Sequence, residues 1–443
     1  MLVSFSFYFY HPFSQIKKFY LRYCYPMNLK LRLTIMNFLQ FFIWGSWLLT
    51  IGAYCFNTKH WSGTEFGAIF STMGFASLFM PAIAGIVADR WINAEKLYGL
   101  FHIIGGIILF FVPTIDNPNS LFWLMLLDMM FYMPTIALAI TVAYSAMKSR
   151  GMDIIKDYPP IRVWGTIGFI VALWVVSLSG FEKSAWQFYV ASLASIILGI
   201  YAFTLPKCPP LGSGHKKSLV EALGLNAFAL FKNYKMALFF IFALLLGASL
   251  QLTNAYGDTF LHDFAEIPTF KDLITIKYPA IIMSISQISE TLFILTIPFF
   301  LTRFGIKKVM LMSMIAWILR FGLFGYGNPA DGLWMIILSC IIYGMAFDFF
   351  NISGSLFVET QCDPSIRARA QGLFMMMTNG IGAVLGSWIS GVIIDQYYTL
   401  PNGSRQWRGI WMAFAIYSLV IAVLFAILFR HKHDPKQTLN MNL

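Results

Sequence analysis

The sequence predicts an all-α membrane protein whose twelve transmembrane helices form two pseudo-symmetric six-helix bundles. The first observation is composition, since 58% of the 443 residues are hydrophobic and only 12% are charged, whereas soluble domains carry about 25% charged residues. The second is a series of about twelve apolar stretches, each long enough to cross a bilayer as a helix. The third is a polar segment, 206–235, that leaves six of these stretches on either side.

The predicted spans each run for roughly 20 residues, the length that crosses the hydrocarbon core. The segment 206–235 opens with Pro/Gly-rich sequence and ends in a short amphipathic stretch, which indicates a linker along the cytosolic face. We therefore predict an N-terminal bundle at 27–205, a C-terminal bundle at 236–430 and a cytosolic tail at 431–443. The spans are placed near 34–56, 64–88, 96–114, 121–147, 160–180, 184–205, 236–259, 278–301, 306–326, 333–357, 368–395 and 408–430.

The net charge of +11 is unevenly distributed along the predicted topology. Of the 31 Lys and Arg residues, 23 fall on the side of the two termini, six on the other side and two within spans. Such a bias places both termini in the cytosol. It also accounts for the basic charge without a nucleic-acid partner, so we expect none.

The first 26 residues differ from the rest. Their apolar part precedes their basic part, the reverse of a signal peptide, and about ten apolar residues are too few to span. MNLKLRL at Met27 is a more natural cytosolic start. We interpret 1–26 as a spurious upstream extension; the alternative is an amphipathic segment at the membrane surface. The five cysteines form no CxxC pair, and we expect no structural disulfide.

Polar and aromatic side chains recur at steps of three or four residues in four spans, so each set shares one helix face. Since polar residues at lipid depth generally mark a pathway, we expect the four faces to line one cavity between the bundles. The sets are Arg162, Thr166 and Phe169 in the fifth span; Gln251 and Asn254 in the seventh; Gln287 and Glu290 in the eighth; and Tyr343 and Phe347 in the tenth, with Asp348 and Asn351 beside them.

The chemistry of these sets indicates the kind of solute. Amides, acids, a guanidinium and aromatic rings suit a neutral, polyhydroxylated solute with a flat ring, such as a nucleoside. Glu290 costs about 2.5–3.5 kcal/mol to place in a membrane, which a role in proton transfer explains. Glu290 and Asp348 are the candidate proton carriers, because a buried carboxylate changes charge as its surroundings change. A purely structural interpretation of Gln251 and Asn254 is hydrogen bonding between helices.

Structural interpretations exist for the charged residues as well. Glu290 can form a static ion pair with Arg162 or Arg320, and Asp348 can hydrogen-bond within a helix break at Gly354. We expect Arg320, near the outer end of its span, to extend its charge to the membrane surface. The histidines show no metal-ligand spacing, so no metal site is predicted.

The two halves also resemble each other weakly. Arg90 and Arg303 close the second and eighth spans, and Arg162 and Arg369 open the fifth and eleventh, at nearly equal separations. These matches suggest a parallel repeat of two six-helix bundles. The match with Arg369 favours a gating or structural role for Arg162, whereas its place in the polar face favours a ligand role.

The sequence GIVADR between the second and third spans resembles the loop motif of the major facilitator superfamily. Gly85, Asp89 and Arg90 match the motif, but its later glycine and basic pair are absent. An Asp–Arg pair at this junction can lock one bundle against the other, so Asp89 and Arg90 are candidate gating residues. The alternative interpretation is a solvated turn.

Longer stretches in both halves resemble the bacterial nucleoside:proton symporter family of this superfamily. They are FLQFFIWGSW, MDIIKDYPPIRVWGTIGF, MSISQISETLFILTIPFFL, AWILRFGLFGYG and YGMAFDFFNISGSLFVE. The resemblance implies the major facilitator fold and proton-coupled nucleoside import by alternating access. It also implies a nucleoside site at Arg162, Thr166, Phe169, Gln251, Asn254, Gln287, Glu290, Tyr343 and Phe347, with proton coupling at Glu290 and Asp348.

The same resemblance implies a multi-pass protein of the bacterial inner membrane that acts on nucleosides such as uridine and adenosine. We expect a monomer with no cofactor other than the coupling proton. Two alternatives remain, a proton-coupled symporter of sugars or another small solute, and a membrane receptor that transports nothing. The sequence contains no nucleophile–base constellation and no large extramembrane domain, so an enzyme is not expected.

Overall fold

The structure, a computed structural model, describes residues 28–210, 225–363 and 366–431. Within these residues the chain forms helices joined by short connections, and one β-bridge pairs Thr399 with Arg405. The predicted N-terminal extension, residues 211–224 of the linker and residues 432–443 of the tail lie outside the described residues.

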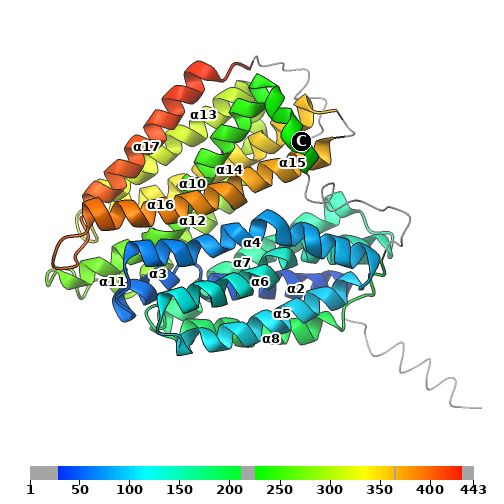
Figure 1. The fold of residues 1–443 in the computed structure, drawn as a ribbon, viewed down its shortest axis with the longest axis horizontal. Coiled ribbons are helices and arrows are strands. Elements are labelled where there is room, and N and C mark those ends of the chain that lie inside the picture. Colours follow the sequence, from blue (N-terminus) through cyan, green and yellow to red (C-terminus); the bar gives the residue numbers. More distant parts are fainter. Residues whose placement is uncertain (1–27, 211–224, 364–365, 432–443) are drawn as a thin grey trace, which may run out of the picture.

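The helices before the linker lie together in the lower half of Figure 1. Their starts follow local capping rules: Ser62 and Glu65 form a capping box at α4, and the Asn117 side chain accepts two backbone N–H groups at α6. This N-terminal bundle consists of α2 (Leu29–Gly45), continued by α3 (Ile51–Ala53) and a π-helix (Tyr54–Thr58), then α4 (Gly63–Arg90), α5 (Ala94–Phe111), α6 (Pro118–Lys148), α7 (Ile154–Leu178) and α8 (Trp186–Ala202).

The helices after the linker form the second group, above the first in Figure 1. Asn233 caps its first helix by accepting the backbone N–H groups of Lys235 and Met236. This C-terminal bundle consists of α10 (Tyr234–Asp263), the short α11 (Ile274–Lys277), α12 (Pro279–Ile294), α13 (Ile297–Tyr326), α14 (Leu333–Gln361), α15 (Arg367–Met375), η5 (Met376–Gly382), α16 (Ala383–Ile393) and α17 (Trp407–Leu428).

The described residues confirm the twelve predicted spans. Nine helices are long and apolar enough to cross a membrane, and α8 and α12 are shorter apolar helices; α2 and its continuation to Thr58 form the remaining, first segment. The eighth span differs from the prediction because it is interrupted between α12 and α13. Pro298, in the first turn of α13, cannot donate a backbone hydrogen bond and disfavours a helical residue before it.

A sharp turn separates the eighth span from the ninth within the range of α13. Gly305 has φ 76° and ψ 167° there, whereas the residues around it are helical. Glycine adopts a positive φ without the steric cost that a side chain imposes. The turn therefore lies between the predicted spans at 278–301 and 306–326.

Hydrogen bonds join the two bundles at the end of the molecule opposite the linker. We call the end at residues 206–210 and 225–233 the linker side, and the opposite end the far side. Asp395, after α16, accepts hydrogen bonds of 2.6 Å from the backbone N–H groups of Gly63 and Thr64 at the start of α4. Trp174, on α7, donates a 2.9 Å hydrogen bond to Ser284 on α12. The described conformation is thus closed on the far side.

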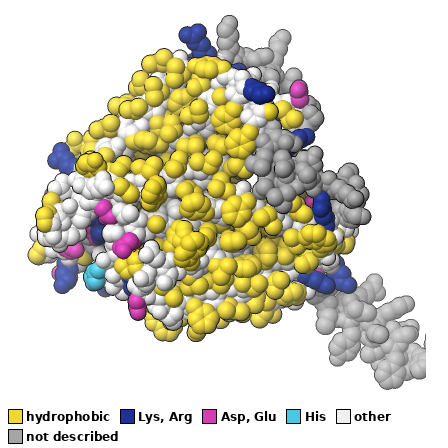
Figure 2. Space-filling view, viewed as in Figure 1, with side chains coloured by type: hydrophobic (Ala, Val, Ile, Leu, Met, Phe, Trp, Pro, Cys, Tyr) yellow, Lys and Arg dark blue, Asp and Glu magenta, His cyan; other side chains and the backbone are white. Residues whose placement is uncertain are grey.

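The outer surface matches a protein surrounded by lipid. Hydrophobic side chains cover the face between the two ends in Figure 2, and most Lys and Arg side chains lie near those ends. Large apolar side chains are strongly exposed on the protein, among them Trp123 at 67% and Leu295 at 76%. Exposure of so extensive an apolar surface to water is energetically unfavourable, whereas a bilayer covers it.

Candidate substrate and proton site

The four predicted polar faces lie on α7 of the N-terminal bundle and on α10, α12 and α14 of the C-terminal bundle. Helix α12 packs against the other three helices. The sets thus meet along α12, at the interface between the bundles. Their members are Arg162, Thr166 and Phe169 on α7; Gln251 and Asn254 on α10; Gln287 and Glu290 on α12; and Tyr343, Phe347, Asp348 and Asn351 on α14.

Arg162 lies at the N-terminal bundle's side of this interface. Its guanidinium carbon is 4.1 Å from the centre of the Phe41 ring, a cation–π contact with α2. Its charge interacts with that of Glu290 across the interface and with the Tyr132 and Tyr158 hydroxyls. The arginine is therefore positioned between the two bundles rather than on the outer surface.

Two acids lie on the opposite side of the interface. The charge of Glu290, on α12, interacts with Arg162 and with Asp348 on α14. Asp348 is buried, and its Oδ2 atom has no hydrogen-bond partner. The ion pairs within 4.0 Å in the described residues do not include Glu290 with Arg162. The static ion pair considered from the sequence is therefore absent from this conformation.

Buried amide oxygens without hydrogen-bond partners occur on α10 and α12. The Oε1 atoms of Gln251 and Gln287 are buried and accept no hydrogen bond. Buried polar atoms in proteins generally have partners, so such atoms call for an explanation. Such free carbonyl acceptors are able to bind the hydroxyl or amine donors of a solute, and Gln287 lies one helical turn before Glu290.

Aromatic rings lie on both sides of the interface. On α14 the rings of Tyr343 and Phe347 are stacked, with centroids 5.9 Å apart and planes 5° apart. On α7, Phe169 meets the Trp44 ring edge-on at 6.5 Å. Trp44 belongs to the stretch FLQFFIWGSW but to none of the four predicted polar faces. Its indole nitrogen has no hydrogen-bond partner, so it joins the candidate residues.

Arg320 corrects a prediction. Instead of extending to the membrane surface, it is fully buried, and its guanidinium donates a 2.6 Å hydrogen bond to the Ser339 carbonyl. It also donates to the hydroxyls of Thr253 and Ser286 and lies 4.6 Å from the centre of the Tyr343 ring. Arg320 thus links α10, α12, α13 and α14 and fixes the aromatic face of the site, but Glu290 is not among its hydrogen-bond partners.

The alternative role of Asp348, hydrogen bonding within a helix break at Gly354, is also wrong. Helix α14 continues without interruption through Gly354 to Gln361, so there is no helix break for Asp348 to cap. Phe374 fills the space beside Gly354, because a Cβ atom there would lie 2.7 Å from its ring. The glycine serves close helix packing, and the buried Asp348 carboxylate has no local structural role in capping.

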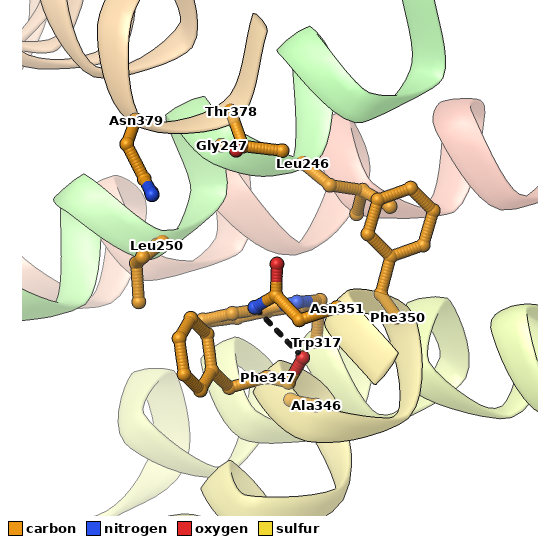
Figure 3. A pocket seen from close by; sticks show the side chains of 10 residues that line it. All are labelled: Leu246, Gly247, Leu250, Trp317, Ala346, Phe347, Phe350, Asn351, Thr378 and Asn379. Atoms are coloured by element: carbon orange, nitrogen blue, oxygen red, sulfur yellow. Dashed lines mark hydrogen bonds between the residues drawn. The ribbon is translucent and has the colours of Figure 1, made fainter. Parts of the chain in front are cut away.

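A small, partly open pocket lies next to the aromatic face. Figure 3 shows Phe347 and Asn351 on one side of it and Leu250, Thr378 and Asn379 on the other. Asn351 donates to the Phe347 carbonyl at 3.2 Å.

The candidate gating pair lies away from this interface. Asp89 and Arg90 are the last two residues of α4, at the linker side; Asp89 is exposed and Arg90 is half-buried. Their position at the end of a helix near the linker fits either a gate or a solvated turn.

Comparisons with known proteins extend over nearly the whole chain. The family model described as "Nucleoside H+ symporter" matches residues 27–434. The xanthosine permease of Escherichia coli K12 is 53% identical over 412 residues, which are 93% of this chain and 98% of the permease. The nucleoside permease NupG of the same organism is 53% identical over 408 residues, 92% of this chain and 97% of that protein.

Solved transporter structures are similar to this chain over nearly its whole length. The crystal structure of the nucleoside transporter NupG matches with a TM-score of 0.87 at 52% identity and covers 92% of this chain and 100% of that one. An inward-facing structure of a bacterial Spinster homologue matches with a TM-score of 0.65 at 16% identity, covering 93% and 97% of the two chains. The second likeness concerns the fold alone, which is that of the major facilitators.

Proposed function

Because this chain belongs to the nucleoside H⁺ symporter family, we propose that the four polar faces on α7, α10, α12 and α14 form the site that carries a nucleoside together with a proton. The protein is a proton-coupled nucleoside transporter of the major facilitator fold and not an enzyme. The observation that best supports the site is the meeting of unpartnered acceptors, paired acids and stacked rings at one interface between the bundles.

The proposed substrate contacts follow from the chemistry of each group. The free Oε1 atoms of Gln251 and Gln287 accept hydrogen bonds from ribose hydroxyls or base amines. The stacked rings of Tyr343 and Phe347, together with Phe169, provide apolar faces for the base. Arg162 donates to carbonyl oxygens, and Thr166 and Asn254 supply further polar contacts. A flat base and ribose hydroxyls are common to purine and pyrimidine nucleosides, so we propose uridine and adenosine as substrates. The similarity to the xanthosine permease adds xanthosine as a third candidate.

The proposed coupling involves Glu290 and Asp348. Two carboxylates close together repel each other when both are charged, and Arg162 compensates only one of them. A proton supplies the missing positive charge. When Arg162 moves with its bundle, its positive charge stabilises the Glu290 carboxylate to a different extent. This change links proton binding to the conformation of the transporter.

The proposed transport cycle is a rocking of the two bundles about this site. The far side is closed by the contacts of Trp174 and Asp395. With both termini in the cytosol, as the Lys/Arg bias predicts, the far side is the periplasmic side of a bacterial inner membrane. We propose that one chain completes the cycle alone, since both bundles and the interface lie within it.

Uptake into proteoliposomes tests this function. Radiolabelled uridine and adenosine should accumulate when the outside is made acidic, and a protonophore should abolish the accumulation. Uptake that ignores the protonophore would contradict proton coupling. Uptake of a sugar but of neither nucleoside would contradict the proposed substrate, and binding of nucleosides without any uptake would indicate a receptor.

A further inference from the structure

A buried cluster of three side chains joins the two bundles on the far side. Glu182 precedes α8 in the N-terminal bundle, and Asp258 and His262 lie one turn apart on α10 in the C-terminal bundle. One ligand atom from each lies within 4.8 Å of the others, and the residues are exposed by only 3%, 1% and 5%. None of these three residues is among the site residues predicted from the sequence.

Glu182 is held so that its side chain points across the interface. Its backbone carbonyl accepts a 2.9 Å hydrogen bond from Gln187 within its own bundle. Its Oε1 atom accepts a 3.1 Å hydrogen bond from the backbone N–H of Ala280 on α12. Its Oε2 atom lies 2.7 Å from Nε2 of His262. One carboxylate oxygen is thus anchored, and the other is directed into the cluster.

The cluster lacks positive charge. Neither oxygen of Asp258 makes a hydrogen bond, and its ion-pair contact is 3.5 Å to the same His262 nitrogen that faces Glu182. One N–H group cannot satisfy two carboxylates. Lys183 influences Asp258 only from beyond ion-pair distance. A buried carboxylate without a hydrogen bond or close cation is costly, so the site is suited to receive a further cation.

We propose that Glu182, Asp258 and His262 form a divalent metal site of the zinc class that clamps the two bundles together on the far side. One imidazole nitrogen and two carboxylate oxygens are zinc ligands, and a water molecule completes the tetrahedron in three-ligand sites. Mg²⁺ and Ca²⁺ prefer oxygen ligands alone. Zinc ligand atoms lie about 3.3 Å apart for bonds of about 2.0–2.2 Å, so small side-chain shifts suffice. Zinc binds the unprotonated imidazole nitrogen, so any proton on Nε2 of His262 is released to solvent when the ion binds.

Occupation of this site has a consequence that depends on the proposed transport function. Glu182 must separate from α10 when the far side opens. A metal ion bound to both bundles opposes that separation, so zinc should hold the transporter in the far-side-closed conformation and inhibit uptake. Binding itself requires no transport, so the metal site and the transport function can be tested separately.

Calorimetry of ZnCl₂ binding to the purified full-length protein, without nucleoside, tests the site. We expect one zinc ion per chain and a rise in melting temperature. Asp258→Asn should weaken binding about tenfold or more while it preserves the contact between Glu182 and His262, and His262→Gln should weaken it similarly. His60→Gln removes an exposed histidine at the far side and should leave binding unchanged. MgCl₂ should not compete.

Absence of zinc binding to the parent protein would overturn the proposal. Equal binding to the parent and to Asp258→Asn would also overturn it, by showing an adventitious ion only. In proteoliposomes, zinc should inhibit nucleoside uptake by the parent and by His60→Gln at least several-fold more than uptake by Asp258→Asn. Equal inhibition of all three proteins, or inhibition of none, would contradict the clamp.

Discussion

The indole nitrogen of Trp174, on α7, lies 2.9 Å from the hydroxyl oxygen of Ser284, on α12, and its hydrogen bond joins the two bundles. The contact is one of several that close the far side, together with the Asp395 carboxylate at the start of α4. The stability of the far-side-closed conformation therefore depends on individual contacts that substitution can remove one at a time.

We predict that Trp174→Phe shifts the transporter toward conformations open on the far side. A lost hydrogen bond costs about 0.5–1.5 kcal/mol, which changes the ratio of two conformations by about two- to tenfold. Labelling of Cys55, a buried free thiol near the far side, by N-ethylmaleimide should become faster. The buried thiol of Cys340 serves as the internal control, and an unchanged Cys55 rate would show that the contact does not limit opening.

Helices α4 and α16 pack so closely that a side chain larger than glycine between them should destabilise the protein. A Cβ atom at Gly391 would lie 2.1 Å from the backbone oxygen of Gly63, so the helices must separate to accept a side chain. Gly391→Ala should therefore lower the melting temperature of the detergent-solubilised protein. Gly322→Ala is the matched control, because nothing lies within 4 Å of a Cβ atom there and alanine favours the helix by about 0.5–1 kcal/mol. Equal melting temperatures for the two variants would contradict this account of the interface.

Arg320 should be structurally necessary rather than a substrate ligand. Arg320→Met removes the hydrogen bonds to Ser339, Ser286 and Thr253, and bonds of a charged group contribute about 1.5–3 kcal/mol each. We predict a clear loss of thermal stability. Arg162→Met, at the interface, should lose nucleoside affinity with a smaller loss of stability. The reverse order of the two stabilities would show that the roles are exchanged.

Phe347→Ala should weaken nucleoside binding by about 0.5–1.5 kcal/mol, through the loss of an aromatic stacking contact. The residue lines the pocket of Figure 3 and stacks on Tyr343. Calorimetry with uridine measures the change. Phe299→Ala removes an exposed ring from the outer surface and should leave affinity unaltered. If Phe347→Ala binds uridine as tightly as the parent, Phe347 is a packing residue.

The sequence predicts the spans well because helix length and hydropathy are local properties. It also predicts which side chains share a helix face, such as Gln287 with Glu290 and Arg162 with Thr166, because steps of three and four residues place side chains together on any straight helix. The interruption after Ile294 was missed, although Pro298 is a visible signal for it.

The sequence does not predict contacts that depend on how separate helices pack together. Arg320 lies near the end of its span, and nothing local indicates that Ser286 and Ser339 from other helices surround it. The four-residue spacing of Asp258 and His262 places them on one helix face, which is visible in the sequence. The contact with Glu182 is not visible there, because Glu182 lies in a connection of the other bundle.

The central claim is that Glu290 links nucleoside movement to a proton, and uptake by Glu290→Gln in proteoliposomes tests it most directly. The variant keeps the shape of the side chain but cannot change its charge. The account predicts that uridine exchange across the membrane persists while accumulation driven by an acidic outside is lost. Glu266→Gln, at an exposed carboxylate on the far side, should accumulate uridine like the parent. Proton-driven accumulation by Glu290→Gln equal to that of the parent would contradict the claim.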